Sequence, residues 1–135
     1  MWNRDDLISA SELQGVITQE TVKFAERFGT YLADKMDRDA KPLTTSQLRR
    51  FFGEVKRQQL MGYDPTSFVM LKPKLAYAVG RAKQNSRDYL KIEDFYTVLA
   101  DAIDKVEQAP DKQKAFKNFI TAFEAIVAYH KASEK

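Results

Sequence analysis

Residues 44–62 read TTSQLRRFFGEVKRQQLMG, and this stretch decides the fold class. It opens with a capping-box pattern, in which Thr44 is followed three residues later by Gln47. The apolar residues after the cap recur at spacings i, i+3, i+4 and i+7, which is one face of a helix: Leu48, Phe51, Phe52 and Val55. Gly62 ends the pattern. The stretch therefore predicts an amphipathic helix that buries one face.

The same two signals, a cap and a helical spacing of apolar residues, appear on the N-terminal side. Ser9 and Glu12 form a second capping-box pattern. Apolar residues follow at helical spacing up to about Met36: Ile17, Phe24, Phe28, Tyr31 and Leu32. Pro42 and the short polar residues before it disfavour continuation. We expect one helix here.

The third helix follows residue 62. Asp64 and Pro65 are typical of an N-cap followed by proline at the first helical position. The helix runs to about Lys83, and Pro73 predicts a kink or a separate first turn. Its buried face consists of Leu71, Leu75, Val79 and Ala82.

Two more helices follow a loop at residues 84–88, and the second of them is expected to start at Pro110. The apolar face of the first of these helices consists of Phe95, Val98, Leu99, Ala102, Ile103 and Val106. That of the second consists of Phe116, Phe119, Ile120, Phe123 and Val127. The sequence thus predicts an all-α fold, a single-domain bundle of about five helices over residues 1–135.

The residue types that catalysis and metal binding usually need are scarce. The chain has no cysteine, which excludes disulfides, thiolate zinc sites and cysteine nucleophiles. His130 is the one histidine, and we expect it to be a partly exposed cation at the C-terminus of the last helix. The string DRDAK at residues 37–41 has a faint likeness to a nuclease motif, but a solvated turn is the better interpretation. We expect no catalytic residue, no metal and no cofactor.

The sequence also bears on localisation. No apolar run approaches the roughly 18 residues of a membrane span. Asp5 and Asp6 lie where a signal peptide would have its apolar core. The absence of cysteine fits a reducing compartment. We expect a cytoplasmic protein with no membrane partner.

Charge is distributed unevenly along the chain. The net charge is +3, but residues 49–91 alone carry +7, and the segments on either side carry −2 each. No Asp or Glu lies between Lys72 and Arg87. A basic segment between two mildly acidic ones favours a surface that binds a polyanion. The alternative is a solvated surface with no binding role.

The basic residues repeat at helical spacing. Positions seven apart share a side of a helix, which pairs Arg49 with Lys56 and Arg50 with Arg57. On the next helix one face holds Lys74, Tyr77 and Arg81, and another holds Lys72 and Lys83. If the two helices pack antiparallel, we expect the Arg49/Lys56 and Lys74/Arg81 pairs to form one basic groove. In the alternative, the cations only extend past the rim of the core and Tyr77 packs inside.

Three segments of the sequence resemble the small subunit of type III-A CRISPR effector (Csm) complexes. They are TTSQLRRFF at 44–52, LKPKLAYAVGRAK at 71–83 and FKNFITAFEAIVAYHK at 116–131. The resemblance implies a helical, non-catalytic protein that stacks in several copies beside the backbone subunits. Its implied partners are target RNA, CRISPR RNA, the large and backbone Csm subunits and further copies of itself, in a filament or dimer.

The resemblance also implies RNA contacts at Arg49, Lys74 and Arg81. The helical spacing adds Arg50, Lys56, Arg57, Lys72 and Tyr77 as further candidates. Because guide pairing reads the sequence, such a subunit is expected to hold phosphates and duplex shape. Two alternatives stay open: the small subunit of the related type III-B complex, and a helical adaptor that binds only proteins.

Overall fold

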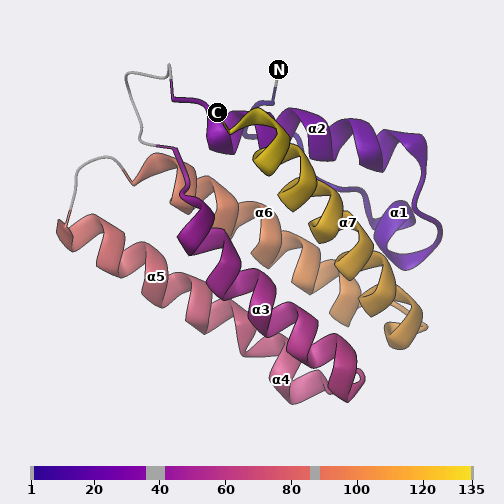
Figure 1. The fold of residues 1–135 in the computed structure, drawn as a ribbon. Helices are drawn as coiled ribbons and strands as arrows, with labels where there is room; N and C mark the ends of the chain where they lie inside the picture. The colour runs from indigo at the N-terminus through magenta and orange to yellow at the C-terminus, as the bar shows by residue number, and fades with distance from the viewer. Residues whose placement is uncertain (1, 36–41, 86–88, 135) are drawn as a thin grey trace.

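The structure is a computed structural model, and it describes residues 2–35, 42–85 and 89–134. Every regular element in these ranges is a helix, so the predicted all-α class is confirmed. There are seven helices in the described ranges rather than about five (Figure 1). In chain order they are α1 (Ala10–Gln14), α2 (Gln19–Ala33), α3 (Thr45–Met61), α4 (Pro65–Val69), α5 (Leu71–Asn85), α6 (Leu90–Glu107) and α7 (Lys112–Ser133).

The N-terminal stretch forms two helices, so the prediction of one continuous helix is wrong. Ser9 caps α1 as expected, but α1 ends after five residues, and Thr18 starts α2 with a cap of its own. Asn118 of α7 donates to the carbonyl oxygens of Leu13 and Gly15, at 2.9 and 3.0 Å. These bonds satisfy carbonyl groups that the end of a helix leaves free, which lets the chain turn there. The end predicted near Met36 lies outside the described residues.

The stretch after Gly62 is also divided, as the position of Pro73 indicated. Asp64 caps α4 by accepting from the Ser67 N–H at 3.1 Å, and Pro65 is the first residue of that helix. The break falls at Met70, which makes α4 the separate first turn. Pro73 is then the third residue of α5, where its missing N–H costs no bond within the helix.

The other predicted boundaries hold within a few residues. Thr44 and Gln47 form the capping box of α3, and Gly62 follows that helix with a φ of +90°. Asp111 caps α7, which starts at Lys112 rather than at Pro110. None of the helices in the described ranges is both long enough and apolar enough to cross a membrane.

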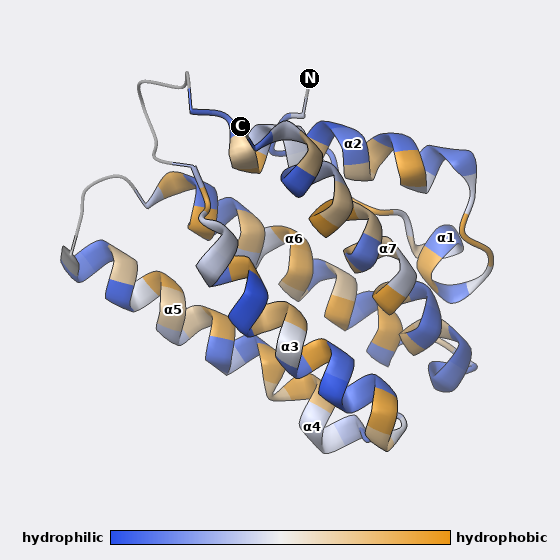
Figure 2. Ribbon diagram, in the orientation of Figure 1, coloured by the Kyte–Doolittle hydropathy of each residue, from blue (hydrophilic) through white to orange (hydrophobic). Residues whose placement is uncertain are grey.

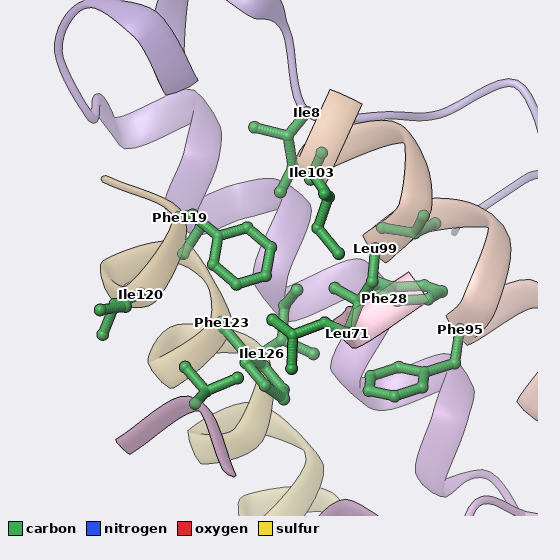
Figure 3. Close-up of a cluster of buried hydrophobic side chains, with 14 of the residues drawn as sticks. Ile8, Phe28, Leu71, Phe95, Leu99, Ile103, Phe119, Ile120, Phe123 and Ile126 are labelled. Atoms are coloured by element: carbon green, nitrogen blue, oxygen red, sulfur yellow. The ribbon is translucent and has the colours of Figure 1, made fainter. Parts of the chain in front are cut away.

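The core is built around α7, which packs against α1, α2, α3 and α6. Apolar and polar residues alternate around the helices instead of forming long blocks (Figure 2). Figure 3 shows part of the single buried cluster that results: Ile8, Phe28, Leu71, Phe95, Leu99, Ile103, Phe119, Ile120, Phe123 and Ile126. All five apolar residues predicted to face inward on the last helix are buried.

His130 belongs to this core, and the expectation of a partly exposed cation is wrong. The side chain has no exposed surface, and its Nε2 lies 2.6 Å from the carbonyl oxygen of Leu43. A carbonyl can only accept, so Nε2 carries the proton of this bond. The bond joins the end of α7 to the residue just before the cap of α3.

The segment from α3 to α5 forms a helical hairpin along one side of the molecule, with α4 at its tip (Figure 1). The two long helices run antiparallel, as the groove prediction required. They pack on different neighbours, because α3 lies mainly against α7 and α5 mainly against α6. This arrangement leaves a groove between α3 and α5.

Candidate nucleic-acid interface

The α3–α5 groove has a volume of about 740 Å³. Its floor is apolar and comes from three helices: Phe51 of α3, Leu75 and Ala78 of α5, and Ile92 and Phe95 of α6. Its rim is polar, with Ser46, Gln47, Arg50 and Glu54 on α3 and Lys74, Tyr77 and Arg81 on α5. The groove therefore joins a hydrophobic surface to a cationic edge.

Tyr77 lies at the rim with 67% of its surface exposed. The alternative in which this ring packs inside is therefore wrong. The guanidinium carbon of Arg81, one helical turn further on, lies 6.0 Å from the centroid of the ring. This distance suits a cation–π contact and leaves most of the ring free.

The groove contains only half of the residues that were expected to form it. Lys74 and Arg81 line it, but Arg50 stands where Arg49 was predicted. Adjacent residues on a helix point about 100° apart. Arg49 therefore lies beside a smaller cavity between α3 and α7, and Lys56 pairs with Glu124 of α7 at 3.5 Å. The single basic groove built from Arg49, Lys56, Lys74 and Arg81 is wrong.

Glu54 is the acidic residue of the rim. It accepts two hydrogen bonds from Arg57, both 2.9 Å, and one from Lys74 at 3.0 Å. The hydrogen bonds from Arg57 are the main cause that lowers the pKa of Glu54 to about 2. Partial burial opposes this shift, and Lys74 adds to it. The carboxylate thus stays charged and links α3 to α5.

Other cations find their acidic partners on α6. Lys72 pairs with Asp104, and Lys83 pairs with Glu93 at 2.9 Å. The lack of acids between Lys72 and Arg87 in the sequence is therefore partly offset in space. Three of the candidate cations have no carboxylate partner among the described residues: Arg49, Arg50 and Arg81.

Sequence reasoning missed the apolar floor and the role of Glu54. Ile92 and Phe95 belong to a helix that showed no basic face, so no local signal tied them to the cations of α3 and α5. Lys91, which contributes to the charge of the basic segment, is buried, and its Nζ lies 2.6 Å from the Asp34 carbonyl oxygen. It therefore adds nothing to the exposed face.

The part of the chain that the structure describes has no group of three or more His, Asp or Glu residues that could hold a metal ion. Asp37 and Asp39, the carboxylates of the nuclease-like string, lie outside the described residues. The described surface has instead a groove with a cationic rim and an apolar floor.

These features define a small all-helical protein whose distinctive surface is a groove with a cationic rim. Residues 17–135 match the family model described as Csm2 Type III-A, and the chain belongs to this family. It is a type III-A Csm small subunit, a component of a multi-subunit complex. Neither a curated protein nor a solved structure matches the chain. The match confirms the resemblance and favours the type III-A family over the type III-B alternative.

Proposed function

We propose that the chain holds RNA inside the Csm complex through the surface of α3 and α5, without catalysing a reaction itself. The observation that carries this proposal is the rim of the α3–α5 groove. Arg50 on the α3 wall and Arg81 on the α5 wall line it without carboxylate partners among the described residues, whereas Lys74 is paired with Glu54. Unpaired cations on opposite walls suit a polyanion.

The mechanism is electrostatic and independent of sequence. Each cation that contacts a phosphate releases counterions, which contributes affinity for any RNA. Base pairing between CRISPR RNA and target RNA supplies the sequence reading. The chain then acts in the cytoplasm beside the large and backbone subunits, with several copies stacked along the RNA. Cleavage belongs to those other subunits.

The remaining candidates have secondary roles in this proposal. Arg49 extends the cationic surface around α3 toward α7. Lys56, Arg57 and Lys72 each have a carboxylate partner, at Glu124, Glu54 and Asp104. RNA must displace that partner before it can bind them, so each contributes less than an unpaired arginine.

The test is RNA binding by single alanine variants at several salt concentrations. Arg50→Ala and Arg81→Ala are each expected to weaken binding to all RNA sequences alike and to lower the salt slope by about one, because one phosphate contact is lost. Lys74→Ala should weaken binding less, because Lys74 is already paired with Glu54. Arg49→Ala should have a smaller effect. Helicity and melting temperature should stay nearly unchanged in the two arginine variants, because Arg50 and Arg81 are exposed and have no carboxylate partner among the described residues.

The matched control is Lys117→Ala, an exposed lysine of α7 that does not line the groove. It should leave binding unchanged. If it weakens binding as much as the groove variants, the RNA surface lies elsewhere. If none of the variants alters binding at any salt concentration, the chain is a protein-only adaptor and the proposal is wrong.

A further inference from the structure

Phosphate binding accounts for the cations of the α3–α5 groove but not for its floor. Phosphate contacts need exposed cations, which a flat helical surface supplies as well as a concave one. Here the cations surround a concavity floored by Phe51, Leu75 and Phe95. Tyr77 adds a large aromatic ring that is two-thirds exposed at the rim. An apolar hollow with an exposed ring suits a ligand that has both a flat apolar part and a charge.

We infer that the α3–α5 groove binds one unstacked nucleobase of a single-stranded RNA segment. The base stacks on Tyr77 with its edge over the apolar floor. Arg81 from α5 and Arg50 from α3 bind the phosphates on either side of that base. This inference rests on the proposed RNA-binding function and adds to it a site for the base itself.

The arrangement of the aromatic and the cations supports this ligand. Proteins that bind single-stranded RNA combine a cationic path for the backbone with aromatic rings on which bases stack. Tyr77 and Arg81 are one helical turn apart on α5, so a base on the ring has a cation beside it. Arg50 stands on the opposite wall of the groove, which α3 forms.

The size of the groove admits a nucleotide, and its charge favours one. A volume of about 740 Å³ lies in the range of sites for small ligands, roughly 300–1,000 Å³. Among the described residues that line the groove, Glu54 is the one acid, and its charge is already balanced by Arg57 and Lys74. Arg50 and Arg81 are left in excess, which complements a phosphodiester on each side of a base.

The first experiment separates base binding from phosphate binding. Fluorescence anisotropy measures the affinity for a short single-stranded RNA and for an abasic ribose-phosphate oligomer of equal length and charge. Wild type should bind the RNA more tightly. Tyr77→Ala should weaken RNA binding about tenfold or more, the usual effect of losing one stacked base, and leave abasic binding unchanged. Tyr77→Phe, which keeps the ring, should bind like wild type.

The outcomes distinguish this inference from the function on which it rests. If Tyr77→Ala leaves RNA binding intact while Arg50→Ala and Arg81→Ala weaken it, the base site is wrong and RNA binding stands. Equal loss for RNA and abasic oligomer would also overturn the base site, because Tyr77 would then act through Arg81. If neither oligomer binds wild type, both proposals fail.

A second experiment uses the assembled complex. The photoreactive substitution Tyr77→p-benzoylphenylalanine crosslinks whatever lies in the groove when the Csm complex carries RNA. Crosslinks to RNA nucleotides are expected. Crosslinks to a protein subunit instead would assign the groove to a peptide segment and overturn the inference.

Discussion

Gly29 lies where α2 meets α7, and the two backbones touch at this residue. A Cβ built on Gly29 would come within 2.7 Å of the Ile126 carbonyl oxygen and 2.9 Å of the His130 nitrogen. Both of these atoms belong to the backbone of α7 and cannot move aside cheaply. We expect Gly29→Ala to lower the free energy of unfolding by about 1–3 kcal/mol, as overpacking of a core does. Urea denaturation measures this.

Gly80 is the matched control, because it lies in α5 with no atom within 4 Å of a Cβ placed there. Gly80→Ala should raise the free energy of unfolding by about 0.5–1 kcal/mol, the gain in helix propensity. A Gly29→Ala variant as stable as wild type would show that the α2–α7 contact can relax.

At the level of the helix, periodicity predicted most of the fold. The predicted apolar faces of α6 and α7 are buried, since a spacing of three and four residues requires a buried side. On α3, Leu48 and Val55 are buried, whereas Phe51 and Phe52 are only partly buried. The break at Gly15 was missed although two local signals mark it, Gly15 at the end of α1 and the Thr18 capping box that starts α2. The hydrogen bonds that Asn118 donates at this break come from far away in the sequence. Tertiary contacts of this kind leave no local pattern.

The candidate site was predicted less well, and for a related reason. Helical spacing places Arg49 and Arg50 on neighbouring sides of α3, but it does not say which side meets α7. Only packing decides that Arg50 faces the groove. Likewise, the partners of Lys72 and Lys83 come from α6, and no pattern within α5 reveals them.

Glu54 connects two helices, and this link is sensitive to pH. Its pKa of about 2 in the folded chain lies below its ordinary value of 4.5. The ionised carboxylate therefore stabilises the fold above about pH 4.5, and this contribution is lost as the pH falls toward 2. Glu54→Gln should cost about 1 kcal/mol at neutral pH, allowing for solvent screening. The variant should also show a shallower fall in melting temperature on acidification.

The control for this prediction is Glu26→Gln, which alters an exposed carboxylate of α2 with no ion-pair partner among the described residues. Its acid profile should follow that of wild type. If Glu54→Gln follows wild type as well, the bridge from α3 to α5 contributes nothing to stability.

On the scale of the whole molecule, charge is separated along the chain and partly offset in the fold, where Lys72 and Lys83 pair with acids of α6. The exposed candidate cations lie on the α3–α5 hairpin, while residues 1–48 and 92–135 are each net negative. Opposite charges on successive copies can set their register, although exposed pairs add little affinity. We expect weak self-association alone and stacking of several copies on long RNA.

Analytical ultracentrifugation with RNAs of increasing length measures this stacking. The number of bound copies should rise with RNA length. Monomers under all conditions, together with a pull-down that retrieves no other Csm subunit, would contradict it.

The layout of the α3–α5 groove predicts that different residues control the association rate and the dissociation rate of RNA. Arg50 and Arg81 lie exposed at the rim. Their electrostatic field attracts RNA before contact and therefore raises the association rate. The apolar floor contacts the ligand only in the bound complex, so it affects the dissociation rate. Salt should therefore slow association, whereas loss of the Tyr77 ring should shorten residence time at an unchanged association rate.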